Sequence, residues 1–423
     1  GNHRWLPRTL PPCTALLLSV LDGPLQEAAA SRFPDAVLVG LPALSDEDGG
    51  RLLDAMLLAG QALAVQRQRR LTPDQRRTVL DAFAQDGRPL YLVLAAGLAR
   101  DWHAWEHPDA LPPSVEGLVA LTVARLRARH GSLIAKRTLD YLCASRYGMS
   151  DMELRDLLWQ DPESRADFEQ RKHANQPDVD ALPPVIWSRL HVDLATWLTD
   201  QSLDGILLHR FFHRIIGEEI ARGTLGDDAQ CIHQRLADYF GRQPLRLPTD
   251  SGTRPNLRRL FEEPWQRILA GELDIAEARL TDFAFVMAKC EADAVEDLLD
   301  DYRRLASALQ EQGQTPSEHL REWTDFMVRN AHYLHRGTPV WPAHKILLQL
   351  AVEDADDSAL TQAAEAWLDQ GHCDWIWLRN KHRRREKGHN PLLAVLEGHT
   401  DNVKGALLMP DGRILSWSQD TTL

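Results

Sequence analysis

The chain has 423 residues, of which 44% are hydrophobic and 26% are charged, and its formal net charge is −13. This composition is typical of folded domains, and the length predicts more than one of them. An acidic chain has no overall attraction for nucleic acid or for an anionic membrane surface, so we expect neither as a partner. No apolar run approaches the roughly 18 residues of a membrane-spanning helix, so the sequence predicts no membrane segment.

The cysteines are spread along the chain without any CxxC pair: Cys13, Cys143, Cys231, Cys290 and Cys373. An odd number at wide spacing is typical of reduced thiols and indicates a cytoplasmic protein. The chain starts at Gly1 without an initiator Met or a signal peptide, so we interpret it as beginning inside a longer protein.

Two short apolar runs near the start, 13–21 and 36–41, are bounded by Gly and Pro. Such runs predict buried strands of a parallel sheet, and the helical stretch between them fits an α/β domain. We therefore expect the first residues to be the end of an α/β core.

Helical patterns follow from Ser45 and dominate to about residue 385. Ser45 precedes a run of acids, and Thr72 precedes Pro73 with Gln75 three residues past the cap. Both arrangements are typical of helix N-termini, and Ser114 opens a further helix after two prolines. The sequence thus predicts a mainly α fold.

Residues 136–225 have a different pattern. Three helical pieces are followed by a turn and short strand at 204–208, and then by a predicted closing helix that carries His209 and His213. Helices with a short hairpin are typical of a winged helix. Beyond residue 225, amphipathic segments predict a helical array, although no clean internal period is found.

A basic run at 379–387 has two interpretations, a patch for nucleic acid or an acidic partner and a solvated linker. The overall negative charge favours the linker. The acidic pairs at 353–354 and 356–357 are interpreted as a helix cap and its solvated face rather than as a metal site.

The last residues carry the most specific pattern in the chain. They match one WD repeat of a β-propeller at Gly398, His399, Asp411, Gly412, Ser416 and Asp420. An Asp-Gly pair supplies the positive φ of a tight hairpin, and the His and Asp resemble the buried pair that ties the strands of a WD blade together. A single repeat cannot close a ring of blades, so we expect a partial first blade. The alternative is an isolated hairpin.

The rest of the chain resembles the segment that precedes the propeller in bacterial-type STAND-class (NACHT-like) NTPases with C-terminal WD repeats. The stretches that carry this resemblance are 5–19, 70–75, 89–92, 111–118, 139–145, 209–214 and 281–302. The domains implied are the end of a P-loop NTPase α/β core at 1–60, a helical lid at 61–135, a winged helix at 136–225, a helical array at 226–385, a linker at 386–391 and a partial WD blade at 392–423.

The resemblance also implies two nucleotide sensors. Ser19 occupies the family's first sensor position near the γ-phosphate, and His213 in Phe212-His213-Arg214 matches a winged-helix histidine that contacts the β-phosphate of ADP. Two other interpretations of His209 and His213 stay open: a zinc pair on one face of a helix, for which no third ligand is evident, and two ordinary helix histidines.

The chain contains no GxxxxGK[ST] loop to hold phosphates and no apolar run that ends in paired acids to hold Mg²⁺. If the resemblance holds, both lie upstream of Gly1. We therefore expect no catalytic residue, metal or cofactor in this chain, whereas the parent protein would bind ATP or ADP with Mg²⁺ as a slow ATPase switch.

Two functions follow from these observations. The first is a signalling segment that couples nucleotide state to capture of a protein partner by the propeller, with self-oligomerisation of the parent protein. The alternative is a non-enzymatic interaction scaffold made of the helical array and the propeller.

Overall fold

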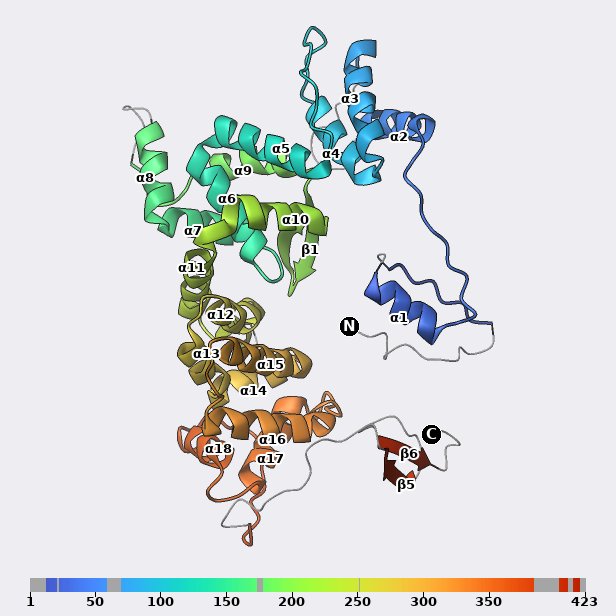
Figure 1. Cartoon of the computed structure of the whole chain (residues 1–423). Coiled ribbons are helices and arrows are strands. Elements are labelled where there is room, and N and C mark those ends of the chain that lie inside the picture. Colours follow the sequence, from blue (N-terminus) through green and yellow to red (C-terminus); the bar gives the residue numbers. More distant parts are fainter. Residues whose placement is uncertain are drawn as a thin grey trace. The chain divides into compact units, whose positions relative to one another are not determined.

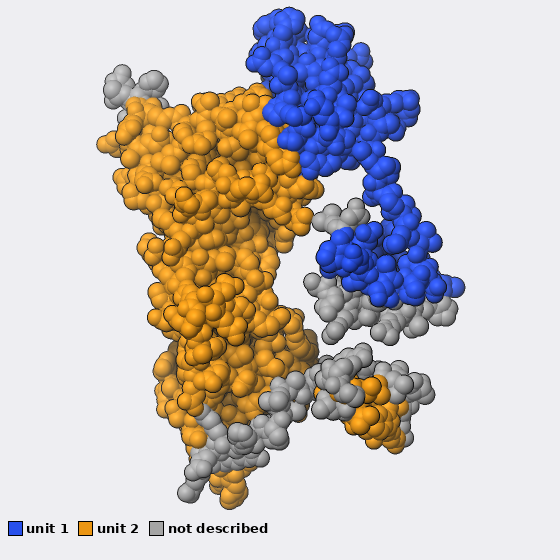
Figure 2. All heavy atoms as spheres, in the orientation of Figure 1, with its two compact units in different colours: residues 1–115 blue, residues 116–423 orange. Residues whose placement is uncertain are grey.

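The computed structural model describes residues 13–20, 23–58, 70–172, 178–250, 252–383, 403–409 and 414–418. The chain divides into two units, residues 1–115 and 116–423, which Figure 2 shows in different colours. Both units are built mainly of helices (Figure 1), so the predicted mainly α fold class is confirmed. None of the described helices is both long and apolar enough to cross a membrane.

The first unit contains α1 (Pro24–Arg32), α2 (Asp46–Leu58), α3 (Pro73–Asp86) and α4 (Pro89–Ala99). The predicted cap at Thr72 forms as expected. Thr72 accepts a hydrogen bond from the Gln75 amide at 3.2 Å, and the Gln75 side chain accepts one from the Thr72 amide at 3.2 Å. This capping box satisfies two backbone donors at the start of α3, and Gly87 at φ 71° ends the helix.

The described parts of the two apolar runs, 13–20 and 36–41, contain no strand. Leu17 and Leu41 are almost fully exposed, at 97% and 91%. A parallel strand needs neighbours on its edges to pair its backbone, and the described residues of this unit supply no such neighbour. The expected sheet is therefore not formed here.

The second unit begins with helices and a hairpin. Its first elements are α5 (Val115–His130), α6 (Ser132–Ala144), α7 (Asp151–Gln160), α8 (Pro162–Arg171), α9 (Pro184–Leu194), β1 (Leu198–Leu203), β2 (Ile206–Phe211) and α10 (Arg214–Ile220). The hairpin turns at Asp204 and Gly205, which have φ values of 55° and 76°. Two consecutive positive φ angles suit a tight two-residue hairpin turn. The assignment of residues 136–225 to a winged helix stays a prediction.

A π-helical turn (Ala221–Leu225) and a short 3-10 turn (Gly226–Asp228) lead from α10 into the array. The hairpin of β3 (Arg246–Thr249) and β4 (Gly252–Pro255) lies between its first two helices. The helices of the array are α11 (Ala229–Arg242), α12 (Leu257–Leu269), α13 (Leu273–Leu280), α14 (Phe283–Glu291), α15 (Val295–Glu311), α16 (Glu318–Leu334), α17 (Ala343–Glu353) and α18 (Ala359–Asp369).

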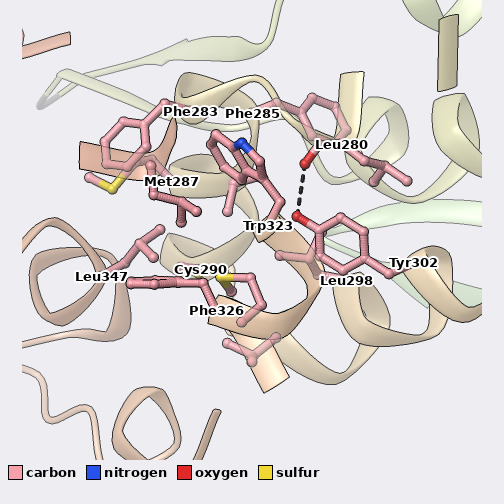
Figure 3. Close-up of a cluster of buried hydrophobic side chains, with 14 of the residues drawn as sticks. Leu280, Phe283, Phe285, Met287, Cys290, Leu298, Tyr302, Trp323, Phe326 and Leu347 are labelled. Atoms are coloured by element: carbon pink, nitrogen blue, oxygen red, sulfur yellow. Dashed lines mark hydrogen bonds between the residues drawn. The ribbon is translucent and has the colours of Figure 1, made fainter. Parts of the chain in front are cut away.

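One hydrophobic core runs through this array (Figure 3). Phe285 of α14, Tyr302 of α15 and Trp323 of α16 are almost completely buried. The hydroxyl of Tyr302 donates to the carbonyl of Leu280 at 2.8 Å, which satisfies the one polar atom of that ring inside the core. Each such buried aromatic side chain contributes about 1.5–3 kcal/mol to folding.

The segment after α18 returns to the array. The side chain of Arg383 is only 4% exposed, forms ion pairs with Asp356 and Glu365, and donates to the Val352 carbonyl at 2.7 Å. The first part of the basic run and one of the acidic pairs are therefore partners of each other. Farther along, β5 (Val403–Leu408) and β6 (Ile414–Ser418) form an antiparallel hairpin.

Candidate functional site

The predicted nucleotide sensor His213 lies at the junction between the hairpin and α10. It is the N-cap of α10, and its Nδ1 accepts a hydrogen bond from the Ile215 amide at 3.2 Å. Because Nδ1 acts as the acceptor, a neutral imidazole carries its proton on Nε2, at the far end of the ring. The local backbone thus selects the tautomer that presents an N–H donor, the group that an anion such as a phosphate oxygen would accept from.

His209 does not share a helix face with His213, so the prediction that placed both on one helix is wrong. It lies in β2, pairs across a β-bridge with Met149, and is 2% exposed. Its Nδ1 and Nε2 lie 2.8 Å from carboxylate oxygens of Asp200 and Asp151. Each ring nitrogen of His209 thus has a carboxylate partner, so the ring is held in place from both sides. The strand continues past the predicted end at residue 208 to Phe211, and the closing helix begins only at Arg214.

An aromatic cluster covers this buried histidine. The rings of His191 and His209 have centroids 4.5 Å apart, and His191 stacks on Trp187 at 5.1 Å. Burial lowers the pKa of His191, and the neighbouring His209 lowers it further. Trp187 donates to Asp151 at 2.7 Å, so the cluster fixes the hairpin against the start of α7.

A buried ionic network joins the helix–hairpin part of this unit to the array. Arg258 of α12 is 4% exposed and contacts Glu153 of α7 through Nε at 2.7 Å and through Nη2 at 3.1 Å. Its guanidinium also donates to the Gly148 carbonyl at 2.8 Å and to Glu262 at 3.3 Å. A bidentate pair of this kind fixes direction as well as distance.

Glu262 closes the same network from α12. It is completely buried, and its carboxylate accepts from the backbone amides of Arg146 and Tyr147 at 3.1 and 3.2 Å. Gln266 donates to Glu262 at 2.9 Å and to the Ala144 carbonyl at 3.0 Å. The end of α6 and the loop that leads to α7 are thus held by side chains of α12.

A second set of charges continues the network into α15. Arg146 lies 2.6 Å from Asp297 and 3.1 Å from Asp301, and the fully buried Lys289 of α14 contacts the same two carboxylates. Burial raises the pKa of Asp301, and the charges of Lys289 and Arg146 oppose that rise. Buried charges of this kind are tolerated only when they are paired.

The network gives the second unit a specific mechanical property. If α7 tilted or slid relative to α12, buried opposite charges would be separated, which is strongly unfavourable. The helix–hairpin part and the first helices of the array are therefore expected to move together. Sequence reasoning missed these residues because the partners are far apart along the chain; Glu153 and Arg258 are separated by 105 positions.

The other predicted site residues lie elsewhere. Ser19 is exposed and belongs to no helix or strand of the first unit. Ser416 lies in β6 opposite Ala406 of β5, in the predicted blade hairpin. The remaining predicted blade residues are outside the described residues: Gly398, His399, Asp411, Gly412 and Asp420.

The zinc interpretation gains no support from the geometry. Among the residues that the structure describes, no group of three or more His, Cys, Asp or Glu side chains is placed to hold a metal ion. His213 caps a helix and His209 binds two carboxylates, so the two rings do not converge on a common point.

Comparison with known proteins found a family model that matches part of the array. Residues 268–370 match the family described as the APAF-1 helical domain. The chain is 27% identical over 328 residues to human NACHT domain- and WD repeat-containing protein 1, a match that covers 70% of this chain and 20% of the relative. The mouse protein of the same name is 27% identical over 326 residues, with the same coverage.

A second relative is more distant. Human NACHT and WD repeat domain-containing protein 2 is 24% identical over 248 residues, which covers 56% of this chain and 13% of the relative. The chain therefore spans about a fifth or less of the length of the curated relatives it matches.

Proposed function

Because this chain is a relative of the STAND-class NTPases with NACHT and WD-repeat features, we propose that it couples nucleotide state to capture of a protein partner. The nucleotide, ATP or ADP with Mg²⁺, binds a P-loop domain of the longer protein. His213 senses the phosphates, and the WD-repeat region captures the partner.

The observation that carries this proposal is the buried network between α7 and α12. A switch needs an element with two positions and a stiff connection that passes the change on. The helix–hairpin part supplies the element, because the half-buried His213 lies in it as the N-cap of α10. The Arg258, Glu153 and Glu262 contacts supply the connection to the array.

A pair of substitutions at His213 tests the sensor role in the longer protein that contains the P-loop domain. His213→Asn keeps a good N-cap for α10 but removes the Nε2 donor, whereas His213→Ala removes both. We expect both variants to lose bound ADP faster than the wild type. Only the alanine variant should also lose about 0.5–2 kcal/mol of stability, the usual contribution of a cap.

The measurement is the rate of release of a fluorescent ADP analogue, with urea unfolding as the stability control. If both variants keep ADP as long as the wild type, His213 is not a nucleotide sensor. If the longer protein binds no nucleotide at all, the interaction scaffold is the correct function and the switch is rejected.

A further inference from the structure

The second unit contains a cavity whose lining residues have no part in the nucleotide switch proposed above. It has a volume of about 730 Å³ and lies where the end of α5 meets α8 and α9. The lining includes the cations Arg129, Arg171, Lys172 and Arg189, and among its described residues Asp193 is the one carboxylate. A cationic cavity stands out in a chain whose net charge is −13.

The single carboxylate is already neutralised. Asp193 lies 2.6 Å from His130 Nε2 and 3.0 Å from Arg129 Nη1. Arg171 donates to the His130 carbonyl at 2.7 Å and lies 3.7 Å from Asp167, so its guanidinium is held beside the cavity. In the described part of the chain Arg189 has no carboxylate partner, so its charge is available to a ligand.

Lys172 is the least exposed of these cations. Its side chain is 9% exposed and pairs with Asp178 at 2.7 Å and with Glu169 at 3.7 Å; the side chain of Asp178 is fully exposed. An ion pair with a fully exposed carboxylate is weak and exchanges readily with solvent or with another anion. A ligand with more than one negative charge can therefore compete for Lys172.

The rest of the lining is apolar. Ile134, Phe168, Ile186 and Val192 contribute hydrocarbon surface beside the cationic side chains. A volume of this size is usual for a small-molecule site, which combines an apolar wall with a few polar groups that fix orientation. Guanidinium groups suit phosphate oxygens, because their N–H donors match them in pairs.

We propose that this cavity binds a small organic phosphate, with the phosphate on Arg189, Arg171 and Lys172 and the apolar part against Phe168, Ile186 and Val192. The cavity would let a second ligand bind the helix–hairpin part. This proposal does not depend on the function proposed above, because His213 is not among the described lining residues.

The test uses calorimetric titration of the intact chain with three probes: 1-naphthyl phosphate, inorganic phosphate and 2-naphthol. Naphthyl phosphate carries both recognised features, so we expect it to bind about tenfold or more tightly than either single-feature probe. Higher salt should weaken the two phosphate probes and leave naphthol unchanged.

Matched variants locate the binding. Arg189→Gln should weaken naphthyl phosphate about tenfold, which is one charge-assisted contact. Arg303→Gln is the control, because Arg303 of α15 is an exposed arginine with 68% of its side chain accessible. This substitution should leave the affinity for naphthyl phosphate unchanged. Val192→Ser should weaken naphthyl phosphate but not inorganic phosphate.

Equal binding of all three probes, or naphthyl phosphate affinity unchanged in Arg189→Gln, would overturn the proposal. Because Arg189 and Val192 are exposed, neither substitution is expected to unfold the chain.

Discussion

Replacement of Arg258 by methionine tests the buried network directly. Methionine keeps the apolar stem of the side chain over the Phe240 ring, whose centroid lies 5.0 Å from the guanidinium carbon. It removes the two contacts to Glu153, the contact to the Gly148 carbonyl and the contact to Glu262. The two carboxylates then stay buried without their cation.

The expected cost follows from that geometry. Glu262 is completely buried and keeps only two backbone amides and Gln266 as donors. Breaking a buried ion pair by removing one partner costs about 3–5 kcal/mol, because an uncompensated charge remains. A domain is stable by only about 5–15 kcal/mol, so we expect a large fraction of the unit's stability to be lost.

Urea unfolding followed by far-UV circular dichroism measures this loss, and hydrogen exchange locates it. Arg303→Met is the matched control, since Arg303 is 68% exposed and lies 3.9 Å from Asp300. An exposed pair of this kind contributes about 0–1 kcal/mol. In Arg258→Met, exchange should rise in α7 and α12 together, because the helices lose the contact that joins them.

The double variant Arg258→Met with Glu262→Gln removes the stranded charge as well. It should therefore be less destabilised than the two single changes summed, by about 1 kcal/mol or more. A loss below about 1 kcal/mol in Arg258→Met alone would refute the reasoning, because that is the value of a surface pair. Exchange confined to one of the two helices would refute the claim that they move together.

Two further predictions concern titratable groups. Burial raises the pKa of Cys290 to about 12 and that of Cys143 to about 11. A disulfide reagent at pH 8 should therefore modify the exposed Cys13 and Cys231 first, the half-buried Cys143 more slowly, and the buried Cys290 only after unfolding. Reaction of all thiols at one rate would contradict this. The pKa of His191 is lowered below its usual 6.5, so the folded state binds this proton less well than the unfolded state. The neutral ring contributes its full stability above pH 6.5, and this contribution is lost as the pH falls through the lowered pKa. In His191→Gln the unfolding free energy should therefore fall less between neutral and acidic pH than in the wild type. An unchanged pH profile would show that the His191 ring is not desolvated.

Local features of the fold could be predicted from the sequence. The capping box at Thr72 and Gln75 involves residues three apart, and so does the bond from the Asp48 amide to the Ser45 hydroxyl. Such interactions depend on residue type and spacing alone, so they need no knowledge of the rest of the chain.

The predictions that failed depend instead on contacts between residues far apart in the sequence. His209 lies in a strand because it pairs with Asp200 across a turn and with Met149, which is distant along the chain. The pairing partners of Arg258 and Arg146 are likewise set by how α7, α12 and α15 pack. Buried charge pairs leave no periodic signal in a sequence, since an isolated Arg or Glu looks the same on a surface.

The contacts of Arg383 determine how a mechanical force applied to the following part of the chain is distributed. Because Arg383 is fixed to Asp356, Glu365 and the Val352 carbonyl, tension applied beyond residue 383 reaches two helices at once instead of unwinding the last turn of α18. The contacts are made to Val352 in α17, to Glu365 in α18 and to Asp356 in the turn between them, so the force is divided among all three. A pull on the chain beyond residue 383 would thus displace α17 and α18 together.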